Sequence, residues 1–318
     1  MGSEKGYGWL TGSAIKPIIL RYVAEIAGQT DKPVIGIGGV VSAEDVVEMM
    51  MAGAAAVGLC TAPILKGVAY LTPKATQIDH DETAKDTIKV LSRYGEGIGI
   101  RKTFGRGFKY MRSVADHAEI PVINMQCETY HPTQALADLL TIKEKFNDDL
   151  RGKKFVISWT YAPNYIRPLS MPQSLILLMS RFGMDVTLAH PKEFNLRPDI
   201  LKQAEANAGE AGVNFDVVDS MEESFRDAHV IYAKSWGPIM HTEDEKAGLK
   251  LIDKYPRWVV DQAKMKLASP EAIYMHCMPA DRDIEVTSEV LDGPQSVIYD
   301  EAENRLHVHK ALMALTMA

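Results

Sequence analysis

Apolar and polar positions alternate along the chain in blocks that predict an α/β protein. Over residues 148–300, short apolar runs typical of buried strands alternate with segments of helical period. This pattern indicates a doubly wound parallel sheet with right-handed crossovers. The expected strands are 154–159, 185–189, 214–218, 229–232, 272–275 and 296–299. The expected helices are 172–182, 198–211, 221–227, 257–267, 287–291 and 304–317.

The first part of the chain shows the same alternation in a less regular form. Residues 12–30 and 42–51 are expected to be helices, and 33–37 and 54–59 strands, which gives one βαβ unit. Its turn contains Gly38 and Gly39, and backbone N–H groups at such a turn suit a phosphate. The elements expected next are a strand at 68–71, a helix at 81–93, a strand at 97–100, a helix at 108–118, a strand at 121–124 and a helix at 131–146.

A polar turn at residues 147–152 separates the two patterns and predicts a domain boundary. The expected organisation is a βαβ fragment at 1–68, a first domain at 69–147, a second domain at 148–300 and a C-terminal helix at 301–318 that returns to the first domain.

Composition narrows the class of protein. The 318 residues carry a net charge of −7, which argues against sequence-independent binding of nucleic acid. The three cysteines, Cys60, Cys127 and Cys277, are far apart and show neither a disulfide framework nor zinc spacing, so a reducing cytoplasm is expected. No apolar run reaches the ~18 residues of a membrane helix, so no membrane partner is expected.

Reactive side chains follow two of the expected strands. His276 and Cys277 come directly after the strand at 272–275, where open α/β sheets bind ligands. Arg101 follows the strand at 97–100, and His131-Pro132-Thr133-Gln134 opens a helix, which together suit an anion. The alternatives are a core cysteine, a surface arginine and an ordinary helix start.

A long strand-to-helix loop at residues 160–173 contains three prolines. Loops between strands and helices usually have about 2–6 residues, and longer ones tend to be functional. A rigid surface loop is the alternative.

With these pieces placed, residues 68–318 resemble the aspartate and ornithine carbamoyltransferase superfamily. The motifs occur in order: Glu82-Thr83 with Asp86-Thr87 ahead of Arg101, then His131-Pro132-Thr133-Gln134, His276-Cys277-Met278-Pro279-Ala280 and Glu303-Asn304-Arg305. The proline-rich loop and Lys234-Ser235-Trp236 resemble the knotted branch, which includes acetylornithine and succinylornithine enzymes.

The resemblance implies transfer of a carbamoyl group from carbamoyl phosphate to an amine, without a metal or organic cofactor, in a homotrimer. It implies that Arg101 and His131 contact the carbonyl oxygen, and that Gln134 and the Cys277 and Met278 carbonyls hold the carbamoyl amide. Arg305 would contact carbamoyl phosphate. The residues implied on the amino-acid side are Lys234, Ser235, Trp236, His276 and Asn164.

One family motif is absent from this sequence, the Ser-x-Arg-Thr-Arg phosphate loop. Residues 1–68 stand in its place and resemble the last part of a flavin-dependent dihydroorotate or dihydropyrimidine dehydrogenase barrel. The turn at Gly38 and Gly39 is a speculative substitute for the phosphate site.

Three functions therefore stay open at this point. The first is a carbamoyltransferase that acts on ornithine, an N-acylated ornithine or a ureide-type substrate. The second is a fused or truncated remnant that binds ligand or serves a structural role without turnover. The third is a flavin-binding dehydrogenase fragment.

Overall fold

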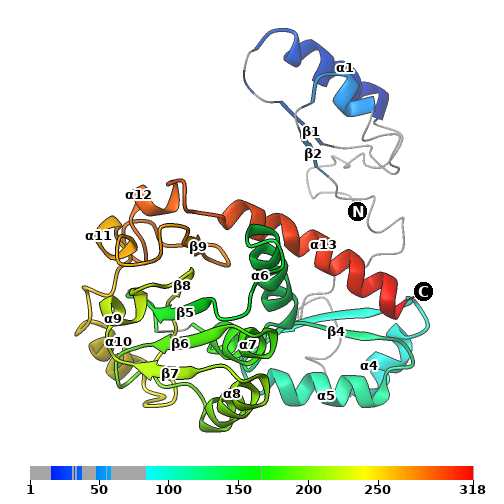
Figure 1. The fold of residues 1–318 in the computed structure, drawn as a ribbon. Helices are drawn as coiled ribbons and strands as arrows, with labels where there is room; N and C mark the ends of the chain where they lie inside the picture. Colours follow the sequence, from blue (N-terminus) through cyan, green and yellow to red (C-terminus); the bar gives the residue numbers. More distant parts are fainter. Residues whose placement is uncertain are drawn as a thin grey trace. The chain divides into compact units, whose positions relative to one another are not determined.

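The computed structural model describes residues 16–30, 32, 34–37, 48–54, 56–58, 84–165 and 167–317. The chain divides into two compact units, residues 1–95 and residues 96–318, and each is described by itself. Figure 1 shows the elements of both.

The first unit holds helix α1 and a two-stranded parallel sheet. Its elements are α1 (Lys16–Ala27), β1 (Ile35–Ile37), β2 (Ala56–Gly58) and α4 (Ala84–Leu91), with a further helical segment at 48–51. β1 pairs in parallel with β2, as the expected βαβ order requires. The small core contains Val23, Met49 and Ala54. Gly38, Gly39 and the strand expected at 68–71 lie outside the described residues.

The second unit begins with a short parallel pair of strands joined by a helix. Strands β3 (Ile98–Lys102) and β4 (Val122–Cys127) pair in parallel around α5 (Gly107–His117). Helix α6 (Pro132–Lys145) follows. Pro132 occupies the first turn of α6, where a backbone N–H would have no partner within the helix, so proline is tolerated there. His131, the residue before it, is the N-cap.

A five-stranded parallel sheet forms the centre of this unit, in the order β7-β6-β5-β8-β9. The chain first moves outward from β5 and then resumes on its other side with β8, so the winding direction reverses between β5 and β8. The strands are β5 (Lys154–Trp159), β6 (Asp185–Ala189), β7 (Phe215–Val218), β8 (Val230–Lys234) and β9 (Ile273–Met275).

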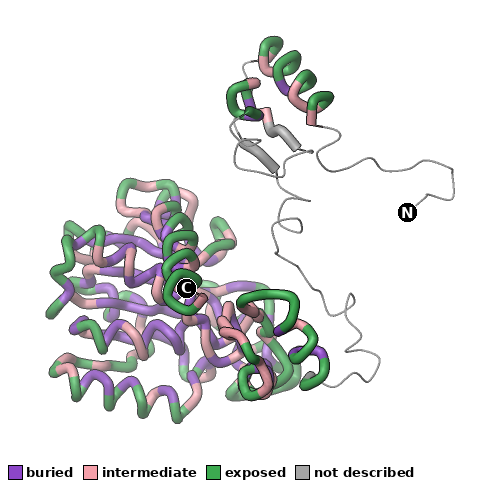
Figure 2. Tube along the Cα trace, turned by 90° about the vertical axis from the view of Figure 1, so that its right-hand side faces the viewer, coloured by how far each residue is buried: buried purple, intermediate pink, exposed green. Residues whose placement is uncertain are grey.

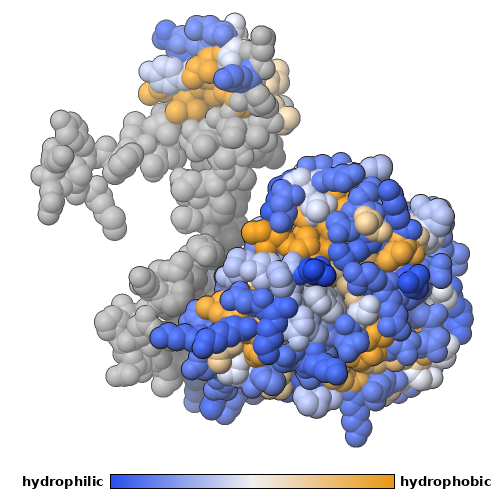
Figure 3. All heavy atoms as spheres, turned by 90° about the vertical axis from the view of Figure 1, so that its left-hand side faces the viewer, coloured by the Kyte–Doolittle hydropathy of each residue, from blue (hydrophilic) through white to orange (hydrophobic). Residues whose placement is uncertain are grey.

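Helices cover both faces of this sheet. One face packs a core around Trp159, Leu175 and Tyr232, and the other packs a core around Phe225, Ile231 and Tyr274. Strands β5, β6, β8 and β9 are largely buried, whereas the edge strand β7 is partly exposed (Figure 2). Figure 3 shows a largely hydrophilic outer surface with small apolar areas. The remaining elements are α7 (Ser170–Met179), η4 (Ser180–Phe182), α8 (Pro198–Ala211), α9 (Met221–Phe225), α10 (Glu245–Ile252), α11 (Gln262–Met265), α12 (Ser288–Leu291) and α13 (Ile298–Thr316).

Helix α13 packs along α6, and polar side chains lock the two together. Asn304 Nδ2 donates to Thr141 Oγ1 at 3.0 Å and to Glu144 Oε2 at 2.8 Å. Lys145 forms an ion pair with Asp300. This packing places the residues of α13 beside the start of α6.

Two sequence expectations for this unit are wrong, one helix was missed, and the last helix begins earlier than expected. Residues 296–299 do not form a strand: Ser296 makes a single bridge to Tyr274, and α13 already begins at Ile298. Residues 257–267 form only the short helix α11. Helix α10 was not expected. Because α13 starts at Ile298, Arg305 lies inside the helix and not at its start.

Candidate functional site

Three strand ends of the five-stranded sheet meet at one buried carboxylate. Thr160 follows β5, Ser235 follows β8, and His276 follows β9. All three contact Glu285, which is 0% exposed. β5 and β8 are the strands between which the winding reverses, and open α/β sheets bind ligands at such a point.

Glu285 collects donors on both carboxylate oxygens. Its Oε1 accepts from the Ser235 backbone N–H at 2.9 Å and from Ser235 Oγ at 2.7 Å. It also faces Lys234 Nζ at 3.5 Å and Arg167 Nη1 at 3.2 Å. Its Oε2 accepts from the Asp281 backbone N–H at 2.9 Å. The carboxylate therefore holds three chain segments in one place.

Glu285 is ionised in this setting. Burial alone would raise the pKa of its carboxyl, but the nearby His276 ring and the charges of Lys234 and Arg167 outweigh burial and hold that pKa well below its usual range. Met278 N–H donates to His276 Nδ1 at 3.0 Å, so the ring proton is on Nε2, which lies 3.4 Å from Glu285 Oε2. Burial also lowers the pKa of His276, which keeps the ring neutral.

Arg167 brings the proline-rich loop to the same place. Its Nη1 donates to Ser235 Oγ at 2.6 Å, and its Nη2 pairs with Asp281 Oδ2 at 2.5 Å. Gly237 N–H donates to the Arg167 carbonyl at 3.1 Å. The loop at 160–169 is therefore anchored against the segment after β8.

A second group of residues gathers at the start of α6. Gln134 Nε2 donates to Asp138 Oδ1 at 2.7 Å and to Glu301 Oε1 at 3.2 Å. Glu301 Oε2 accepts the His276 backbone N–H at 2.9 Å, which ties the end of β9 to α13. Gln134 Oε1 is buried without a hydrogen-bond partner, so a strong acceptor is left unpaired.

His131 is a neutral imidazole that is influenced by the charges of two arginines. Burial, followed by the charges of Arg305, Arg101 and His309, lowers the pKa of His131 to about 3. Its backbone N–H donates to Ser174 Oγ at 2.8 Å, and its ring Nδ1 is buried without a partner. Arg101, from β3, is exposed, and Arg305 is half-buried. The charges of both arginines are close enough to His131 to lower its pKa, so positive charge gathers near the start of α6.

Cys277 and Met278 follow His276 directly at the end of β9. Burial raises the pKa of the Cys277 thiol, so the sulfur is protonated and poorly suited to nucleophilic attack. Met278 adopts a left-handed backbone with φ of 46°, and its side chain is 37% exposed. A non-glycine residue in this conformation is uncommon and is often found at functional sites.

Other predicted residues lie apart from these groups. Trp236 is buried, and its indole N–H donates to the Phe194 carbonyl at 2.8 Å, so the ring belongs to the core. Asn164 is exposed in the proline-rich loop. Gly38 and Gly39 lie outside the described residues.

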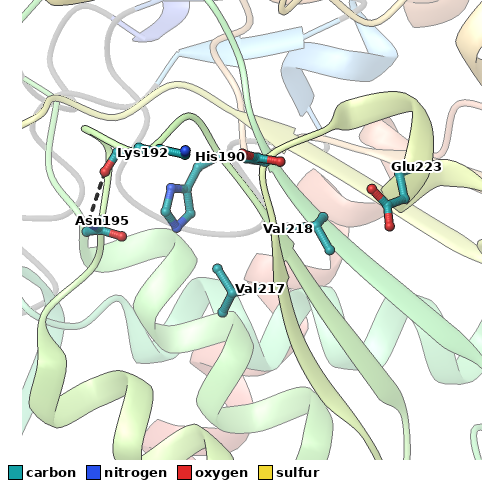
Figure 4. Close-up of a pocket in the computed structure, with 7 residues that line it drawn as sticks. His190, Lys192, Asn195, Val217, Val218 and Glu223 are labelled. Carbon is teal, nitrogen blue, oxygen red and sulfur yellow. Dashed lines mark hydrogen bonds between the residues drawn. The ribbon is translucent and has the colours of Figure 1, made fainter.

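The carboxyl ends of β6 and β7 border a separate pocket of about 490 Å³ (Figure 4). It is lined by His190, Lys192, Asn195, Val217, Val218, Asp219 and Glu223. Burial lowers the pKa of His190, whose Nδ1 faces the Pro191 carbonyl at 2.8 Å. None of the residues predicted from the sequence lines this pocket.

Across the described residues, no group of three or more His, Cys, Asp or Glu side chains is arranged to hold a metal ion. No helix in the same part of the chain is long and apolar enough to cross a membrane.

Sequence profiles of protein families match most of the chain. Residues 63–144 match the carbamoyl-phosphate-binding domain of aspartate/ornithine carbamoyltransferases, and residues 169–316 match the Asp/Orn-binding domain. Ornithine carbamoyltransferase of Caldicellulosiruptor saccharolyticus is 38% identical over 244 residues, which cover 77% of this chain and 75% of that protein. The chain belongs to the aspartate/ornithine carbamoyltransferase family.

Other members of the carbamoyltransferase family agree with this assignment. YgeW of Escherichia coli (strain K12) is 37% identical over 276 residues, covering 75% of this chain and 70% of YgeW. A crystal structure of acetylornithine transcarbamylase complexed with acetylcitrulline has a TM-score of 0.72 and 29% identity, covering 98% of this chain and 100% of that chain. Residues 2–80 match a different family, dihydroorotate dehydrogenase. Both resemblances expected from the sequence are thus confirmed.

Sequence reasoning missed several residues of this candidate site. Asp138 could have been suspected, because it lies four residues after Gln134 on the same helix face. Glu285 gave no signal, because it lies in an irregular segment and becomes important only through tertiary contacts. Sequence reasoning also missed Glu301, Arg167 and Tyr232, because their contacts join segments that are far apart in the sequence.

Proposed function

We propose that the protein binds carbamoyl phosphate and transfers its carbamoyl group to the amino group of an amino acid of the ornithine or N-acylated ornithine type. One observation carries this proposal. A neutral, buried His131 has its pKa lowered by the charges of Arg305 and Arg101. Three residues later in the chain, the Gln134 amide has a buried Oε1 without a hydrogen-bond partner.

Each of these groups suits one part of the transfer. In attack on the carbamoyl carbon, negative charge develops on the carbonyl oxygen, which N–H donors from His131 and Arg101 stabilise. Gln134 Oε1 and the carbonyls of Cys277 and Met278 accept hydrogen bonds from the carbamoyl NH₂. Phosphate leaves and takes a proton, while Arg305 supplies positive charge.

The acceptor amine would lie on the Glu285 side, near Lys234 and Ser235. The solved relatives support an acceptor of this class: one variant of N-acetyl-L-ornithine transcarbamylase was crystallised with carbamyl phosphate and N-succinyl-L-norvaline, at a TM-score of 0.73 and 29% identity. An attacking amine must be neutral, so activity should rise with pH as the amine deprotonates.

Calorimetric titration of the full chain with carbamoyl phosphate, followed by a colorimetric ureido assay with ornithine, N-acetylornithine and N-succinylornithine, tests the proposal. Arg305→Met should weaken carbamoyl phosphate binding about tenfold or more, since a charge-assisted bond is lost. Arg282→Met should change it little, because Arg282 pairs with Asp292 at the surface. Absence of heat at millimolar carbamoyl phosphate would refute the proposal.

A second function is favoured by the absent Ser-x-Arg-Thr-Arg motif, which leaves the phosphate with fewer donors. We propose binding without turnover as this alternative. Heat of binding without any ureido product across the amine panel would support it. The homotrimer and the cytoplasmic location implied by the sequence also remain proposals, and sedimentation analysis tests the first.

A further inference from the structure

Two carboxyl groups meet in the interior between α6 and α13. Asp138 is 0% exposed and Glu301 is 1% exposed. The single amide nitrogen Gln134 Nε2 donates to both. Glu301 Oε1 also accepts from Tyr232 at 3.2 Å, whereas Asp138 Oδ2 has no donor. Neither acid has an ion-pair partner among the described residues.

The groups that face this pair cannot neutralise two negative charges. They are Tyr232 from β8, Cys277 and the His276 N–H after β9, Gln134 from α6, and Arg305 from α13, which acts at a distance. Burial raises the pKa of Asp138 to about 7, and burial together with Asp138 raises the pKa of Glu301. Two buried acids in contact titrate as one unit, so they hold one proton near neutral pH.

The acid pair decides which way the Gln134 amide points. Both carboxyl oxygens that face the amide accept hydrogen bonds, so its NH₂ must turn toward them. Its Oε1 is therefore directed away from the acids. A flipped amide would set an oxygen against two acceptor oxygens, which is unfavourable.

We propose that Asp138 and Glu301 form a positioning pair that fixes Gln134 with its Oε1 toward the carbamoyl group and holds the end of β9 through the His276 N–H. This inference rests on the proposed function and goes further, because it assigns a role to two residues that do not contact substrate. Glu301 joins both parts of the carbamoyl-holding edge, the Gln134 amide and the backbone before Cys277.

Asp138→Asn tests the positioning role at nearly constant volume. An asparagine can present either oxygen or NH₂ to Gln134, so the amide orientation is no longer fixed. Carbamoyl phosphate affinity by calorimetry should fall about tenfold, equivalent to about 1.4 kcal/mol. Glu144→Gln is the matched control on the same helix, because Glu144 contacts Asn304 and not the pair. It should stay within about twofold of wild type. Unchanged affinity in Asp138→Asn would overturn the proposal.

Two spectroscopic measurements test the role of the Asp138–Glu301 pair even if carbamoyl phosphate does not bind. Infrared spectra of the wild type and of Glu144→Gln at neutral pH should contain the band of a buried protonated carboxyl, and the double variant Asp138→Asn/Glu301→Gln, which removes both acids, should lack it. The Gln134 side-chain N–H signals in NMR, assigned by their loss in Gln134→Met, should exchange slowly in the wild type and faster in Asp138→Asn. No protonated carboxyl in the wild type, or equal exchange in both proteins, would overturn the inference.

Discussion

His131 and Glu285 show how burial and neighbouring charges set protonation at the candidate site. His131 is neutral because burial and the charges of Arg305 and Arg101 lower its pKa. Its ring can therefore donate one hydrogen bond without carrying charge. Glu285 is ionised because His276, Lys234 and Arg167 outweigh its burial. Both buried groups thus favour their deprotonated form, which leaves His131 neutral and Glu285 negatively charged.

The pKa of His131 makes stability depend on pH. Its pKa is about 3 in the folded chain and about 6.5 when unfolded. Between these values the unfolded chain binds a proton that the folded chain does not, so the free energy of unfolding falls as pH falls. From pH 7 to pH 5 this loss should reach about 2 kcal/mol. His131→Asn should lose correspondingly less in denaturant unfolding. As the control, the free energies of unfolding of wild type and His131→Asn should change in parallel above about pH 7.5. Equal losses of this free energy in both proteins at pH 5 would contradict the prediction.

Removing the charge of Glu285 should be costly. Glu285→Gln leaves Arg167 and Lys234 without their buried partner, and breaking such a pair costs about 3–5 kcal/mol. Asp281→Asn is the matched control, because Asp281 contacts the same arginine but its side chain is 37% exposed. It should cost under about 1 kcal/mol. Urea unfolding measures both, and similar losses in the two variants would argue against the role of Glu285.

At the scale of elements, the periodicity of apolar residues predicted the helices and strands whose bounds are set by the local sequence. Strands β5 and β6 and helix α8 have the expected bounds, because long apolar runs and Pro198 mark them clearly. The segment 296–299 failed because Ser-Val-Ile-Tyr has strand-like composition, yet only Ser296 finds a strand partner and α6 provides a surface for a helix. The strand-end residues of the candidate site were foreseeable, whereas Glu285 and Glu301 depend on contacts between distant segments.

Two helical glycines should respond oppositely to alanine. A Cβ at Gly248 in α10 would overlap the Tyr165 ring of the proline-rich loop. Gly209 in α8 has no atom within 4 Å of the same position. Gly209→Ala should therefore raise the free energy of unfolding by about 0.5–1 kcal/mol, from helix propensity alone. Gly248→Ala should lower it by about 1–3 kcal/mol. Denaturant unfolding compares them, and a stabilising Gly248→Ala would show that the loop yields easily.

At the scale of the whole molecule, the chain combines segments similar to two families. Residues 2–80 match dihydroorotate dehydrogenase, and residues 63–144 and 169–316 match the two carbamoyltransferase domains. The described core of the first unit is small, and a complete barrel requires eight strands. We therefore expect the purified full chain to show no flavin absorbance in the visible range. A yellow protein that releases flavin on denaturation would reverse this expectation.

His276 has a consequence for how the two sides of the site communicate. Its backbone N–H is bound by Glu301, and its ring Nε2 faces Glu285. One residue is thus shared by the side proposed to hold the carbamoyl group and the side proposed to hold the amine, so mutations on the two sides should not be additive. A double-mutant cycle of Glu285→Gln and Glu301→Gln should reveal an interaction free energy of about 0.5–3 kcal/mol. Strict additivity would mean that the sides respond independently.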